Sequence, residues 1–149
     1  MMFIAKFVHV LGFTVWVGGM FFAYMALRPV AASVLQPPER LSLWAGVFAK
    51  FFVWVWVCVA LVFASGMAMM AVIGKPPLYV MAMFVLGVAM MLLFAHVFFA
   101  PFKRLKRAVA AKDWPAGAMA LASIRKLVAI NLSLGLVTIA VGLLGPLLG

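Results

Sequence analysis

Four long apolar blocks constrain this chain more than any other feature of its sequence. They cover residues 3–27, 51–73, 78–101 and 127–148. Each is close to the roughly 20 residues that a helix needs to cross about 30 Å of hydrocarbon. Strands are excluded because the blocks show no apolar–polar alternation and an open sheet edge cannot lie in lipid. The blocks therefore predict a single all-α domain, an integral membrane bundle of four transmembrane helices.

The composition argues against a soluble domain of this size. Hydrophobic residues make up 70% of the 149 residues and charged residues only 9%, whereas about a quarter of the residues in soluble proteins are charged. The first block is too long for a cleaved signal peptide and Arg28-Pro29 follows it, so we expect a retained helix. The single cysteine, Cys58, excludes an intramolecular disulfide.

The basic residues gather at one end of the predicted bundle. Ten of the twelve Lys and Arg residues lie in two of the segments that join the blocks. Between the first and second blocks these are Arg28, Arg40 and Lys50, and between the third and fourth blocks they are Lys103, Arg104, Lys106, Arg107, Lys112, Arg125 and Lys126. Basic short loops stay cytoplasmic, which predicts a protein of the bacterial inner (cytoplasmic) membrane with both termini periplasmic. Their placement favours contact with anionic headgroups of the lipid bilayer over a nucleic-acid partner.

The connections on the basic side are predicted to extend the spans as helices. The Pro-Pro-Glu sequence at residues 37–39 is typical of a helix N-terminus, where a missing N–H is tolerated and an acidic side chain is favourable. Apolar residues then recur at helical spacing, which predicts an amphipathic interfacial extension over residues 38–50. Asp113 is a suitable N-cap for a second extension over residues 114–126.

Ionisable side chains inside the apolar blocks are the strongest functional signal, because such groups are costly in hydrocarbon. Three stand out: Lys6 and His9 in the first block and His96 in the third. For Lys6 the alternatives are an anchor that reaches the headgroups and a binding role. For each histidine they are a hydrogen bond across helices and ligation of iron or copper by the neutral ring.

Depth along the helices constrains which of these ligands can cooperate. At 1.5 Å per residue, His9 and His96 are predicted to lie roughly 20 Å apart in depth, so each needs a partner at its own level. Met67 and Met83 share the predicted level of His9, and Met20 shares that of His96. His–Met pairs suit either haem iron or Cu(I).

The first and third blocks resemble two related families of membrane proteins. The resemblance is carried by Lys6-x-x-His9, Trp16-Val17-Gly18-Gly19 and Arg28-Pro29 in the first block, and by Leu92-Leu93-Phe94-Ala95-His96 in the third. These motifs are similar to those of HemJ-type protoporphyrinogen oxidases and of CopD-type copper-resistance membrane proteins. The end of the third block is more similar to HemJ, whereas the Trp-x-Gly-Gly motif and the methionine content are more similar to CopD.

Similarity to HemJ implies haem b bound inside the membrane and oxidation of a porphyrinogen. It implies His9 and His96 as the ligand positions, with Lys6 near a haem propionate. Trp16 and Gly19, on or beside the same helix face, complete the implied cofactor site.

Similarity to CopD implies copper at the outer face, with His9, Met67 and Met83 as ligands. Two departures from the HemJ pattern weigh against porphyrinogen oxidation. The third block has no early lysine, and Asn-Leu-Ser at residues 131–133 stands in place of Asn-Glu-Pro.

These patterns leave three hypotheses. The first is a haem-b-binding redox protein, an oxidoreductase similar to the protoporphyrinogen oxidases, with a redox partner in the membrane. The second is a copper-handling protein with a His/Met site near the outer face. The third is an accessory subunit of a respiratory membrane complex whose histidines only make hydrogen bonds. Exposed glycines in the first block also favour a homodimer.

Overall fold

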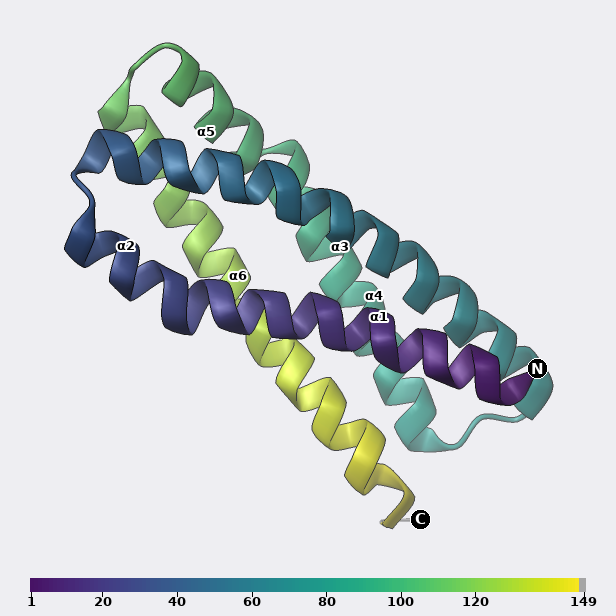
Figure 1. Ribbon diagram of the computed structural model, residues 1–149. Coiled ribbons are helices and arrows are strands. Elements are labelled where there is room, and N and C mark those ends of the chain that lie inside the picture. The colour runs from purple at the N-terminus through teal and green to yellow at the C-terminus, as the bar shows by residue number, and fades with distance from the viewer. Residues whose placement is uncertain (148–149) are drawn as a thin grey trace.

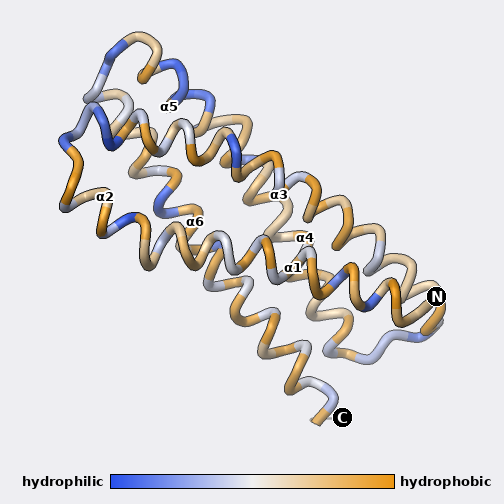
Figure 2. Tube along the Cα trace, in the orientation of Figure 1, coloured by the Kyte–Doolittle hydropathy of each residue, from blue (hydrophilic) through white to orange (hydrophobic). Residues whose placement is uncertain are grey.

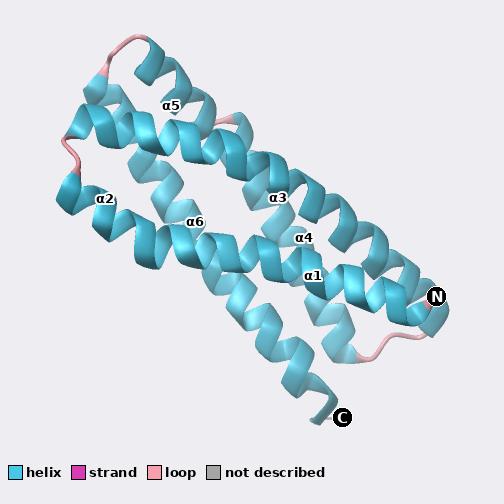
Figure 3. Ribbon diagram, in the orientation of Figure 1, coloured by secondary structure: helices cyan, strands magenta, loops and turns pink. Residues whose placement is uncertain are grey.

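The computed structural model describes residues 1–147, and every element among them is helical (Figure 1). The elements are α1 (Met2–Phe22), a π-helical turn η1 (Ala23–Leu27), α2 (Arg28–Val34), α3 (Pro37–Ile73), α4 (Leu78–Phe99), α5 (Pro101–Ala110), α6 (Trp114–Leu144) and a 3₁₀ turn η2 (Gly145–Leu147). Short connections join them (Figure 3). The last residue of the predicted 127–148 span lies outside the described residues.

These elements form four rods that are long and apolar enough to cross a membrane: Met2–Val34, Pro37–Ile73, Leu78–Ala110 and Trp114–Leu147. The predicted all-α bundle of four transmembrane helices is confirmed. Residues 38–50 are the first turns of α3, whose 37 residues would span about 55 Å, well beyond the hydrocarbon thickness. Most of the hydrophilic chain gathers around the α2–α3 and α5–α6 connections, and both termini lie at the opposite end (Figure 2).

Prolines explain the two irregularities within the rods. Pro29 has no N–H to donate to the preceding turn, and the helix widens into the π turn Ala23–Leu27, closed by the Arg28 N–H bonded to the Ala23 carbonyl. Pro101 disfavours helical geometry at Ala100, which has a φ of −114° and a ψ of −86°. Helix α4 therefore ends at this residue, and α5 begins in a new direction. Both irregularities lie on the basic half of the bundle.

A single glycine permits the tight reversal between α3 and α4. Gly74 ends α3 with a φ of 74°, a left-handed conformation that residues with a side chain rarely adopt. Pro77 then precedes the first turn of α4 and accepts hydrogen bonds from Val80 and Met81. This reversal makes α3 and α4 antiparallel.

Aromatic side chains hold the basic half of the bundle together. Phe52 of α3 lies at the centre, with its ring centroid 4.9 Å from that of Phe102 and 5.3 Å from that of Phe94, both edge to face. Phe48 stacks on Phe52 at 5.0 Å. Edge-to-face pairs add about 0.5–1.5 kcal/mol each to the burial of the rings, so this cluster fixes how α3 packs against α4 and α5.

The start of α6 offers a test of its predicted cap. The Asp113 side chain accepts a hydrogen bond from the Ala116 N–H at 3.2 Å, as expected of an N-cap. We expect Asp113→Ala to lower the free energy of unfolding in detergent by about 1 kcal/mol. Asp113→Asn keeps an accepting oxygen and should stay near the parent. Equal losses in the two variants would contradict the cap.

Candidate functional site

His9 is held against α3 by two hydrogen-bond contacts. Its Nδ1 lies 3.0 Å from the Val62 carbonyl oxygen and 3.1 Å from the Ser65 hydroxyl. The Ser65 hydroxyl itself donates to the Leu61 carbonyl at 2.6 Å, so its oxygen is free to accept. The ring is therefore fixed on the face of α3 that packs against α1.

These contacts determine which ring nitrogen of His9 carries the proton. A backbone carbonyl can only accept, so Nδ1 donates to Val62 and carries the hydrogen of the neutral ring. The lone pair is then on Nε2. Metal-binding histidines show the same arrangement, in which one ring N–H is oriented by a carbonyl and the other nitrogen faces the metal. The hydrogen bond and ligation are thus compatible.

A glycine on α3 makes room for this ring. A Cβ on Gly66 would lie 3.3 Å from His9 Cε1, closer than most such contacts, and 3.6 Å from Nδ1, an ordinary contact distance. Met69 and Met70 follow one helical turn after Ser65 and Gly66, on the same side of α3, and both are half-buried. On α1, the small residue Ala5 precedes His9 by one turn. One turn outward from His9, α3 therefore carries two thioether side chains and α1 carries a small one.

His96 lies in a different environment. It is exposed on the outer surface of the bundle, in the last turn of α4. The Trp16 and Phe94 rings are 6.2 Å apart and mark a common level. His9 precedes Trp16 by seven residues and His96 follows Phe94 by two, which separates the histidines by about 13 Å along the bundle axis. The structure does not bring them together.

The remaining positions of the implied cofactor site on α1 serve packing or face outward. Trp16 is 1% exposed and packs edge to face on Phe94. At Gly19 a Cβ would overlap the Phe51 ring, so a neighbouring helix occupies the space that this glycine leaves. Lys6 is exposed.

The predicted methionine ligands are dispersed. Met20 is buried in the core, one helical turn beyond Trp16. Met67 is 44% exposed, and it lies two residues past Ser65, about 200° around the helix from the face that holds His9. Met83 packs against α6, its sulfur 3.2 Å from the position of a Cβ on Gly142.

The described residues do not fit a haem held between His9 and His96. The two rings lie at different levels, and only His9 faces a neighbouring helix. The interior cavity beside Trp16 and Met20 has a volume of about 20 Å³, enough for one water molecule. The haem hypothesis therefore gains no support from the packing.

Sequence reasoning identified His9 but missed its partners Val62, Ser65 and Gly66. The Ser-Gly pair interrupts an otherwise apolar stretch of the 51–73 block, which is the signal that could have found them. Among residues 1–147 no three His, Cys, Asp or Glu side chains gather into a metal site.

Comparison with known proteins gives one family. The profile described as copper resistance protein D (CopD) matches residues 45–144, which include most of α3 and all of α4, α5 and α6. Neither the curated proteins nor the solved structures give a match. With two thirds of the chain matched and four helices able to span a bilayer, this multi-pass membrane protein belongs to the copper resistance protein D family.

Proposed function

We propose that this protein handles copper and binds Cu(I) as its cargo through His9 Nε2 and the Met69 thioether. The observation that carries the proposal is the hydrogen bond from His9 Nδ1 to the Val62 carbonyl, which leaves Nε2 as the lone-pair nitrogen. The family match favours copper over haem as the metal.

The chemistry of the surroundings supports a soft, low-coordinate ion. Thioether and neutral imidazole ligands select Cu(I), and neither adds charge to an apolar site. Met69 lies one turn beyond Ser65 on the α1-facing side of α3, and on α1 the small residue Ala5 lies one turn before His9. Met70 lies beside it and provides a second thioether.

The charge distribution supports an orientation for this site. The positive-inside rule puts the basic end of the bundle in the cytoplasm, so the termini and His9 lie toward the periplasm of the inner membrane. Copper would then enter from the periplasmic side, close to the N-terminus of α1.

X-ray absorption of the Cu(I)-loaded protein in detergent tests the ligand set. We expect one copper per chain, with one nitrogen and at least one sulfur in the first shell. Met69→Leu should remove a sulfur scatterer. Met67→Leu, two residues away on the opposite side of α3, should leave the spectrum unchanged.

Other spectra would contradict the proposal. A shell of oxygen and nitrogen alone would exclude the methionine ligand. No copper retained by the folded protein would favour the structural-subunit hypothesis, in which His9 only joins α1 to α3.

A further inference from the structure

A cavity lies far from His9, at the basic end of the bundle. It has a volume of about 360 Å³ and opens between the end of the first rod, the start of α3 and α6. This volume is in the range of ligand-binding pockets, about 300–1,000 Å³. The copper proposal makes no use of it.

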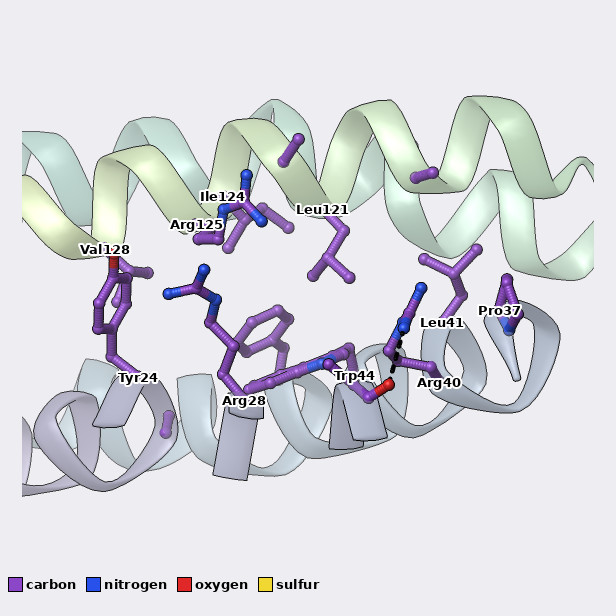
Figure 4. Close-up of a pocket in the computed structure, with 15 residues that line it drawn as sticks. Tyr24, Arg28, Pro37, Arg40, Leu41, Trp44, Leu121, Ile124, Arg125 and Val128 are labelled. Atoms are coloured by element: carbon purple, nitrogen blue, oxygen red, sulfur yellow. Dashed lines mark hydrogen bonds between the residues drawn. The ribbon is translucent and has the colours of Figure 1, made fainter. Parts of the chain in front are cut away.

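Three arginines from three separate segments line this cavity. Arg28 comes from the start of α2, Arg40 from α3 and Arg125 from α6. Figure 4 shows the Arg28 side chain extending across the cavity toward α6, where Arg125 lies, with Arg40 further along the same opening. Like charges brought together in this way favour an anion between them.

Among residues 1–147 no acidic side chain lines the cavity to neutralise these charges. The whole chain has only two acidic residues against twelve basic ones, and one of the two, Asp113, caps α6. Arg28 lies over the Tyr24 ring at 4.8 Å, and Arg40 donates one long hydrogen bond of 3.5 Å to the Ala32 carbonyl. Each guanidinium carries five N–H donors, so most of the donors remain available.

The rest of the lining is apolar. Trp44 and Phe48 of α3 line the cavity, together with Leu41, Leu121 and Ile124. Tyr24, within the π turn that precedes Pro29, also lines the cavity, and its ring lies beside Val128 (Figure 4). A ligand with an anionic group and an adjoining apolar part would satisfy both halves of the cavity.

The depth of the cavity in the membrane is suited to a ligand that has an anionic group and an apolar part. Arg28 directly follows the apolar block 3–27, and Arg125 lies two residues before the block 127–148. Both therefore lie at the depth where lipid phosphates begin. Basic pockets between transmembrane helices on this side are suited to anionic headgroups.

We propose that this cavity is a binding site for a phosphate group, supplied by the headgroup of an anionic phospholipid or by free phosphate. Arg28 and Arg125 grip the phosphate oxygens from two sides. Arg40 adds charge from α3, and Trp44 packs against the apolar part of a lipid. The bound phosphate then links the first rod, α3 and α6.

Thermal unfolding of the full-length protein in an uncharged detergent tests this site. Short-chain phosphatidylglycerol is compared with phosphatidylcholine, and inorganic phosphate with chloride at equal ionic strength. At about 100 times its Kd a ligand of the folded state should raise Tm by about 5 °C or more. A rise with phosphatidylglycerol alone identifies a lipid site, and a rise with inorganic phosphate identifies a free-phosphate site.

Variants of equal charge separate a specific site from general attraction. Arg28→Gln and Arg125→Gln should each remove at least half of the rise in Tm. Arg104→Gln, an exposed arginine of α5 that does not line the cavity, should keep it. Arg125 is itself exposed, so its replacement leaves the core intact.

Two results would overturn the proposal. One is the absence of stabilisation by either phosphatidylglycerol or phosphate. The other is an equal loss of stabilisation in the Arg104 and Arg125 variants, which would mean that the whole basic surface attracts the anion. The number of phospholipid molecules that each variant retains, counted by native mass spectrometry, compares the Arg104 and Arg125 variants without heating.

Discussion

Cu(I) binding is expected to weaken by roughly 100-fold or more when His9 is replaced by phenylalanine. Mutation of a residue that merely orients a ligand costs about 10–100-fold in metal affinity, and His9 is the proposed ligand itself. Phenylalanine keeps a ring of similar size beside Gly66 and removes both nitrogens. The measurement is a competition titration of the purified protein against a chromophoric Cu(I) chelator.

His96→Phe is the matched control for this experiment. His96 has the same chemistry but lies exposed on α4, about 13 Å from His9 along the bundle axis. We expect its copper affinity to equal that of the parent. Unchanged affinity in His9→Phe, or an equal loss in both variants, would be incompatible with a site at His9.

The sequence predicted the spans well because hydrophobic length and charge position are properties of the chain itself. The blocks that end near Leu27 and Ile73 appear as helical rods, and the reversal at Gly74 lies between two of them. The breaks beside Pro29 and Pro101 also follow from local chemistry, since proline lacks an N–H and restricts its neighbour.

The contacts of His9 could not be predicted in the same way. The depth of a residue in the membrane can be predicted by counting residues along its helix, and this count predicts that Met67 lies near the level of His9. The face of a helix that meets its neighbour depends on how both helices rotate, which is set by packing at positions such as Gly12 and Val62. That rotation turns Ser65 toward His9 and Met67 away from it.

The glycine pair of α1 shows how much this rotation matters. Gly18 and Gly19 are adjacent in sequence and alike in chemistry. A Cβ on Gly18 would have no atom within 4 Å, whereas one on Gly19 would overlap the Phe51 ring of α3. The close approach that glycines permit is therefore used by a neighbouring helix at one of the two positions only.

Gly19→Leu is accordingly expected to destabilise the folded protein by about 1–3 kcal/mol, the usual cost of overfilling a packed contact. Gly18→Leu should be neutral or stabilising by up to about 1 kcal/mol, because leucine is the better helix former and faces open space. The free energy of unfolding of both variants in the same detergent gives the comparison. Since α1 carries His9 and α3 carries its carbonyl partner, Gly19→Leu should also weaken Cu(I) binding, whereas Gly18→Leu should not. Equal stability of the two variants would mean that α1 and α3 do not pack in this register, and the carbonyl that orients His9 would then lie elsewhere.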